Sequence, residues 1–189
     1  MNRFDLTCRL TRKLKGEAVI GGIGNTNFDL WASGRRPENF YMLGSMGLAI
    51  PIGLGVALAQ PRRKTFVLEG DGSLLMQLGS LGTVAATAPK NLAIIVFDNQ
   101  MYQITGSQKS LTAATVDLVA MAKGAGLAKS EWAKDEAHFE TLVDRALAAD
   151  GPFFIGAKID GAKPAGVTER DPARIRIRFM DALAQKGGV

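Results

Sequence analysis

The stretch Thr65-Phe66-Val67-Leu68-Glu69-Gly70-Asp71-Gly72-Ser73 joins an apolar run to a polar turn that contains two glycines. A helix-like segment follows, and then a second apolar run, Leu92-Ala93-Ile94-Ile95-Val96-Phe97, which ends at Asp98-Asn99. Two strands separated by a helix form a βαβ unit, whose right-handed crossover brings both carboxyl ends to one edge of a parallel sheet. We therefore expect Asp71 and Asn99 to lie close together, although they are 28 positions apart.

These residue types predict a metal site that carries a diphosphate. A carboxylate, an amide oxygen and nearby backbone carbonyls are the hard ligands that suit Mg²⁺. Gly72 lets the backbone approach a phosphate, and the start of the next helix offers free N–H groups. Asp and Ser are also common helix N-caps, so capping is the alternative role for Asp71 or Ser73 when either residue is considered alone.

Strand-like and helix-like segments alternate along the whole chain. We expect strands at 17–21, 39–42, 64–69, 91–97, 127–131 and 153–158, helices at 2–15, 26–33, 46–59, 74–88, 115–124, 136–149 and 172–186, and an irregular loop at 99–113. This alternation is typical of an α/β fold with three layers, a doubly wound and mostly parallel sheet covered by helices on both faces. A length of 189 residues predicts a single domain over 1–189.

Composition excludes several other classes of protein. The 23 Lys and Arg outnumber the 18 Asp and Glu, but they are scattered, and two Trp and two Tyr offer no stacking platform, so we expect no nucleic-acid partner. No apolar run approaches the length of a membrane span, and the N-terminus lacks the apolar core of a secretory signal. A single cysteine, Cys8, excludes an internal disulfide. We expect a cytoplasmic protein without a membrane partner.

The Gly-Asp-Gly turn and the later asparagine resemble the motif of thiamin-diphosphate (ThDP) enzymes. Two further segments, Asn39–Gly47 and Asp98–Tyr102, are similar to the small subunits or C-terminal halves of sulfopyruvate and phosphonopyruvate decarboxylases. The similarity runs from about Val19 to the C-terminal helix. It implies that the chain is a ThDP diphosphate-binding domain, the C-terminal or beta part of a 2-oxoacid decarboxylase, with ThDP and Mg²⁺ as cofactors.

The resemblance also implies roles for individual residues. Asp71, Asn99 and the backbone carbonyl of Met101 would bind the metal, although Asp98 replaces the first asparagine of the family's usual pair and a glycine is common at position 101. Met46 would be the apolar wedge that keeps the cofactor folded; the alternative is a core residue at the start of a helix. The cofactor-binding set implied in this way is Gly24, Asn25, Thr26, Gly44, Ser45, Met46, Gly70, Asp71, Gly72, Ser73, Asn99, Met101, Tyr102, Gln103 and Ile104.

One catalytic residue of the family has no counterpart in this chain. The family needs a glutamate beside the aminopyrimidine ring, and this glutamate belongs to a separate pyrimidine-binding domain. Here Glu17, Glu38 and Glu69 lie beside other elements and the remaining glutamates lie on expected surface segments, so we assign no certain catalytic residue. We expect a pyrimidine-domain (alpha) subunit to supply the glutamate, in a hetero-oligomer with at least two copies of each chain.

The implied reaction is decarboxylation of a small 2-oxoacid, with release of CO₂ and an aldehyde. The substrate would be dianionic, like sulfopyruvate or phosphonopyruvate, and Arg35, Arg36 and Lys109 are candidates to meet its second charge. The alternatives are a carboligase subunit of the acetolactate-synthase kind and a non-catalytic ThDP-binding subunit. A dinucleotide-binding loop at Gly22–Asn27 is disfavoured, because Asn27 stands where the third glycine of that motif belongs.

Overall fold

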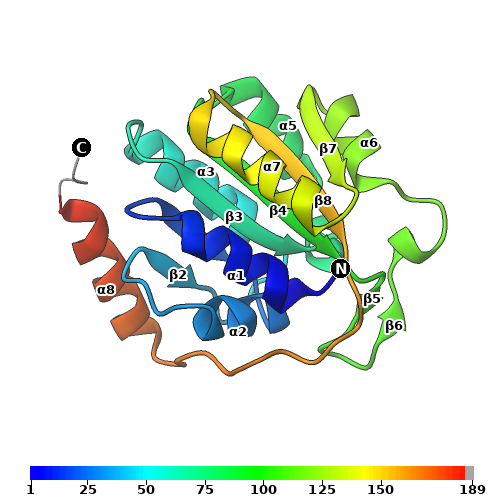
Figure 1. Cartoon of the computed structure of the whole chain (residues 1–189), viewed down its shortest axis with the longest axis horizontal. Coiled ribbons are helices and arrows are strands. Elements are labelled where there is room, and N and C mark those ends of the chain that lie inside the picture. The colour runs from blue at the N-terminus through cyan, green and yellow to red at the C-terminus, as the bar shows by residue number, and fades with distance from the viewer. Residues whose placement is uncertain (186–189) are drawn as a thin grey trace.

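Six strands form one parallel sheet in the computed structural model, which describes residues 1–185 (Figure 1). Their order across the sheet is β2-β1-β3-β4-β8-β7. The strands are β1 (Ala18–Gly21), β2 (Asn39–Tyr41), β3 (Thr65–Gly70), β4 (Leu92–Asp98), β7 (Lys129–Ala133) and β8 (Phe153–Lys158). The chain leaves β1 toward β2 and then returns to place β3 on the other side, so a topological switch point lies between β1 and β3.

The central strands are buried on both sides, which explains their nearly continuous apolar sequences. Every residue of β4 is buried, and in β3 only Gly70 is not. The two strands pair in register from Thr65 opposite Leu92 to Gly70 opposite Phe97. Their carboxyl ends therefore stop level with each other, and the turns that follow them lie side by side.

Helices cover both faces of the sheet. They are α1 (Arg3–Lys13), α2 (Asn25–Ala32), α3 (Ala49–Ala59), α4 (Asp71–Leu75), α5 (Gly79–Thr87), α6 (Leu118–Gly124), α7 (Glu136–Ala148) and α8 (Pro172–Ala184). Helices α1, α2 and α7 cover one face of the sheet, with one core cluster beneath them. Helices α3, α5 and α6 cover the other face, above the second core cluster. Figure 1 shows α1 and α7 side by side over the first face. The expected three-layer, doubly wound α/β fold is confirmed.

Several expected elements have other bounds in the structure, and for two helices the backbone shows the reason. The helix expected at 74–88 is two helices, because Met76 and Gln77 donate to the carbonyls three residues back, at Ser73 and Leu74, and this tightened turn ends α4. The helix expected from 46 begins at Ala49, since Ser45 (φ 66°) and Gly47 (φ 84°) hold a left-handed backbone.

The loop expected at 99–113 contains regular structure. It holds a short antiparallel hairpin, β5 (Met101–Tyr102) and β6 (Gln108–Lys109), followed by a 3₁₀ turn at Leu111–Ala113. Position 186 of the last expected helix, and the end of the expected domain, lie outside the described residues. Among residues 1–185, no helix combines the length and apolar character that crossing a membrane requires.

Candidate functional site

A pocket opens at the carboxyl edge of the sheet, beside the switch point. The pocket is open to solvent on one side, and its empty space, with that open part included, amounts to about 620 Å³. Its walls come from the turns after β1, β3 and β4, from the hairpin, and from the segment after β8. The lining residues are Arg3, Ile23, Asn25, Thr26, Met46, Glu69, Gly70, Asp71, Gly72, Ser73, Phe97, Asn99, Met101, Tyr102, Gln103, Ile104, Thr105 and Ile159.

Asp71 and Asn99 meet in this pocket. Asp71 is the first residue of α4 and is 2% exposed, and Asn99 follows β4 directly. Both side chains line the pocket, so the convergence expected from the βαβ unit is confirmed. Their role as metal ligands stays a prediction.

The Asp71 carboxylate is held from behind by two hydroxyl groups. Ser110 donates to its Oδ2, and the Thr112 hydroxyl lies 3.2 Å from the same oxygen and 2.7 Å from Oδ1 of Asp98. Burial raises the pKa of Asp71, and the nearby Asp98 carboxylate adds to this effect, whereas the hydrogen bonds from Ser110, Gly72 and Thr112 oppose it. A divalent cation in the pocket would stabilise the ionised form of Asp71. The carboxylate of Asp71 and the amide oxygen of Asn99 are oxygen ligands of the kind that Mg²⁺ prefers, so the residues present fit this ion.

The segment after Asn99 is shaped by the asparagine itself. The Met101 amide donates to Asn99 Oδ1 at 3.1 Å, and the left-handed backbone falls on Gln100 (φ 63°). Met101 therefore lies in the extended strand β5, where its side chain causes no strain. Within residues 1–185 no three His, Cys, Asp or Glu side chains gather as a metal cluster, so a metal here would use amide, backbone and ligand oxygens as well.

Close packing of the hairpin requires glycine at two positions, one in the pocket and one in the turn after β1. A Cβ at Gly72 would lie 2.4 Å from the Tyr102 ring, and a Cβ at Gly24 (φ 65°) would lie 2.7 Å from Ile104. Because the hairpin packs directly onto both turns, Gly72 is needed for protein packing as well as for the approach of a phosphate. The sequence motif indicated only the second reason.

Ser73 connects the two halves of the predicted cofactor site. Its Oγ accepts a hydrogen bond from the Gly47 amide at 2.7 Å, which ties α4 to the loop that carries Met46. Met46 lines the pocket, as expected for a wedge, but Gly44 and Ser45 are exposed and do not line it. Gly24 is also absent from the lining, whereas the other twelve predicted cofactor residues are present.

Glu69 is a pocket residue that sequence analysis set aside. Its side chain is enclosed (0% exposed), Oε1 accepts from the Gly70 amide at 3.0 Å, and Oε2 has no hydrogen-bond partner among residues 1–185. Burial raises its pKa to about 7, although Ser73 and the Gly70 and Ala49 amides oppose the shift. The feature of the sequence that could have identified Glu69 is a charged residue at the end of an otherwise apolar strand.

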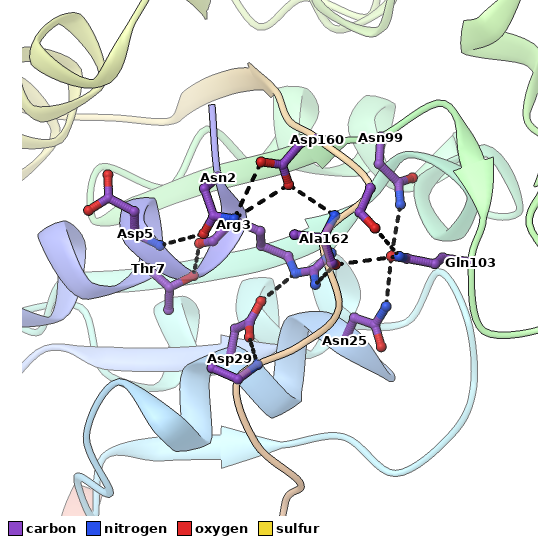
Figure 2. A network of polar contacts seen from close by, with 12 residues as sticks. Asn2, Arg3, Asp5, Thr7, Asn25, Asp29, Asn99, Gln103, Asp160 and Ala162 are labelled. Carbon is purple, nitrogen blue, oxygen red and sulfur yellow. Dashed lines mark hydrogen bonds and ion pairs between the residues drawn. The ribbon is translucent and has the colours of Figure 1, made fainter.

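A strap formed by residues 159–166 borders the pocket at Ile159 and is held by a polar network (Figure 2). Gln103 Nε2 donates to the Gly161 carbonyl at 2.6 Å, while its Oε1 accepts from Asn25 at 2.8 Å and from Asn99 at 3.3 Å. Arg3 enters from α1 and donates to the Ala162 carbonyl at 3.3 Å. No local pattern marked Arg3 or the strap, because their contacts join opposite ends of the chain.

The three cations expected to meet a second substrate charge lie elsewhere. Arg35 stacks over the Trp31 ring at 4.7 Å, and Arg36 donates to the carbonyls of Lys15 and Glu17. Lys109 is exposed on β6. None of the three lines the pocket in this chain.

Comparison with known proteins places this geometry in context. The model of the thiamine pyrophosphate enzymes' C-terminal TPP binding domain matches residues 22–157. The chain is 42% identical over 181 residues to the sulfopyruvate decarboxylase subunit beta of Methanothermobacter thermautotrophicus, covering 95% of this chain and 94% of that protein. It is 44% identical over 166 residues to the phosphonopyruvate decarboxylase of Streptomyces hygroscopicus, of which it spans only 41%.

A solved structure agrees at the level of the fold. Benzoylformate decarboxylase from Polynucleobacter necessarius superimposes with a TM-score of 0.70 at 22% sequence identity, covering 84% of this chain and 33% of that one. At this identity the likeness concerns the fold alone.

Proposed function

The chain belongs to the thiamine pyrophosphate enzymes, and from this membership we propose that it is the diphosphate-binding subunit of a ThDP- and Mg²⁺-dependent decarboxylase. Its substrate would be a small dianionic 2-oxoacid, similar to sulfopyruvate or phosphonopyruvate, and its products CO₂ and an aldehyde. The names of the relatives support the substrate class. The whole described chain would act as one diphosphate-binding domain.

The observation that carries the proposal is the meeting of Asp71 and Asn99 in one pocket at the switch point. Asp71, Asn99 and the Met101 carbonyl would hold Mg²⁺, and the turns at Asn25–Thr26 and Gly70–Ser73 would hold the diphosphate. The bound cofactor supplies the electron sink that decarboxylation needs. The chain's own residues would bind and orient it, with Met46 as the apolar support.

We propose that the site is complete only with a pyrimidine-domain (alpha) subunit. The family's catalytic glutamate would come from that subunit, because Glu69, the only glutamate that lines the pocket within residues 1–185, is enclosed and already accepts from Gly70. Relatives of similar length carry the name subunit beta, which supports a partner chain. A site shared between chains favours a hetero-oligomer with at least two copies of each.

Exposed apolar side chains beside the pocket support this partnership. Leu43 (43% exposed) and Leu48 (39%) flank the Met46 loop, and Met76 (56%) and Ile104 (55%) lie beside the turns that form the pocket. Large apolar side chains gathered around a site are typical of a surface that another chain covers.

Calorimetric titration of ThDP with Mg²⁺ tests the proposal. The purified chain is titrated alone and again with a pyrimidine-domain subunit from the same genome, and Asp71→Ala is the control. We expect metal-dependent binding that strengthens with the partner and disappears in Asp71→Ala; the absence of binding in both samples would contradict the cofactor assignment.

A substrate screen then separates decarboxylase from carboligase. The assembled complex is supplied with sulfopyruvate, phosphonopyruvate or pyruvate, and its products are identified. We expect CO₂ and an aldehyde from a dianionic acid. A carbon–carbon coupling product from pyruvate would favour the acetolactate-synthase alternative, and binding without turnover would favour a non-catalytic subunit.

A further inference from the structure

Arg3 is a buried cation that reaches the pocket from the start of α1, outside the family match at residues 22–157. It is 5% exposed. Among the pocket-lining residues within 1–185 it is the only Lys, Arg or His. Burying a guanidinium is unfavourable unless it is paired, so its position calls for a physical explanation.

Of the ion pair that holds Arg3, only the arginine lines the pocket. Arg3 Nε lies 2.6 Å from Oδ2 of Asp29, and Nη2 donates to the Ala162 carbonyl. The other Asp29 oxygen accepts from the Ala165 amide at 2.7 Å, and Asp29 does not line the pocket. The remaining nitrogen of Arg3, Nη1, has no hydrogen-bond partner among residues 1–185, which leaves it available to a ligand.

The network links Arg3, through the strap and Gln103, to the predicted metal site. The Ala162 carbonyl accepts from Arg3 at 3.3 Å and from Gln103 at 3.4 Å. Gln103 in turn accepts from Asn99, a predicted metal ligand, and from Asn25 in the turn after β1. In Figure 2, Arg3 and Gln103 meet at Ala162 of the strap, and Asn25 and Asn99 meet at Gln103.

The negative charge of a pocket that holds a diphosphate favours a contact between the diphosphate and a cation such as Arg3. Asp71 and Glu69 both line the pocket, and a diphosphate adds more negative charge than one divalent cation neutralises. A guanidinium hydrogen bond to a phosphate oxygen is charge-assisted and among the stronger polar contacts in proteins. We propose that Arg3 binds the cofactor diphosphate through Nη1, an inference that rests on the proposed function.

Binding measurements test this role without requiring turnover. Mg²⁺-ThDP and, separately, Mg²⁺ with inorganic pyrophosphate are titrated into the full chain assembled with its partner subunit. We expect Arg3→Gln to raise the Kd of both ligands by about 10- to 100-fold, the usual effect of losing one charge-assisted contact. Arg3→Lys, which keeps the charge, should show a smaller rise.

Matched variants separate a ligand contact from structural effects. Arg12→Gln makes the same charge change at an exposed position of α1 and should leave both Kd values unchanged. The double variant Arg3→Gln/Asp29→Asn replaces the buried ion pair with neutral groups, so it guards against misfolding caused by an unpaired Asp29. It should show the same loss of affinity, with thermal unfolding as the check that each variant is folded.

Two outcomes would overturn the Arg3 proposal. One is an unchanged Kd for both ligands in folded Arg3→Gln or in the double variant. The other is an equal loss in Asp160→Ala, which removes a strap contact but keeps the cation, because the position of the strap would then account for the effect. Failure of the wild-type assembly to bind either ligand would instead contradict the proposed function.

Discussion

The floor of the pocket, formed by Glu69–Ser73 and Asn99, continues directly from two buried strands, whereas its rim, the strap at 159–166, is held by side chains from the other end of the chain. Floor residues are enclosed: Glu69 is 0% and Asp71 2% exposed. Strap residues are half-buried or exposed. The floor thus contains carboxylates whose burial opposes ionisation, while the rim is stabilised by many individually weak contacts.

This difference predicts that the floor residues lower the stability of the ligand-free protein while they strengthen ligand binding, and that the rim residues do not. A buried carboxylate with a raised pKa destabilises the ligand-free protein, and it contributes a favourable interaction only when a cation is bound. Exposed hydrogen bonds contribute modestly whether or not a ligand is bound. Variants of the two regions should therefore separate affinity from stability.

The largest effect is expected from Asp71→Asn. This variant keeps the size of the side chain and removes the charge, so the Kd of Mg²⁺-ThDP should rise by about 1,000-fold, or about 4 kcal/mol. The ligand-free protein should unfold at the same or a higher temperature, because a desolvated charge is gone. Calorimetric titration and thermal unfolding measure the two quantities; a marked fall in the unfolding temperature would break the contrast between floor and rim.

The next effect concerns the pH dependence of stability and the enclosed acid Glu69. Its pKa rises from 4.5 to about 7 on folding, so the folded state favours the protonated acid. The associated stability is fully present below pH 4.5 and is lost as the pH rises through 7. Glu69→Gln is always neutral, and its free energy of unfolding relative to wild type should increase by about 2 to 3 kcal/mol between pH 5 and pH 8.

Denaturant unfolding of the ligand-free chain at the two pH values measures this change. Glu136→Gln, at the start of α7 and away from the pocket, serves as the control for a lost carboxylate. Parallel pH profiles for wild type and Glu69→Gln would show that Glu69 ionises in the folded chain as it does in the unfolded one.

A moderate effect is expected from Gly72→Ala. The added Cβ would lie 2.4 Å from the Tyr102 ring, so the hairpin must move away from the floor, at a cost of about 2 kcal/mol in the free energy of unfolding. Gly82→Ala is the matched control: nothing lies within 4 Å of its Cβ, and alanine favours the interior of α5. If both variants are equally stable, close packing is not the reason for glycine at 72.

The smallest effect is expected at the rim, from Asp160→Ala. Asn2 lies 3.4 Å from both oxygens of Asp160, and the Ala162 amide donates to one of them at 3.0 Å. These contacts are exposed, so their loss should lower the free energy of unfolding by about 0.5 kcal/mol. Denaturant unfolding measures it, and a loss comparable to that of Gly72→Ala would show that the strap is as firmly integrated as the floor.

Sequence reasoning succeeded where the decisive residues directly follow buried strands. The ends of β3 and β4 are level because parallel pairing and the apolar pattern define their register, and Asp71 and Asn99 follow at once. It failed at the expected helix 74–88, which a tightened turn at Met76 and Gln77 divides. It also set Glu69 aside, since its exposure depends on how α3 and α4 pack around it.

By itself, the sequence determined the α/β class, the order of strands and helices, and the pairing of the Gly-Asp-Gly turn with Asn99. These features depend on local periodicity and on the handedness of a βαβ crossover, which short stretches of chain encode. Only the tertiary structure decided that Arg3, Glu69 and the strap belong to the same pocket. Their contacts join residues up to 159 positions apart, and no local pattern records which distant groups a folded chain brings together.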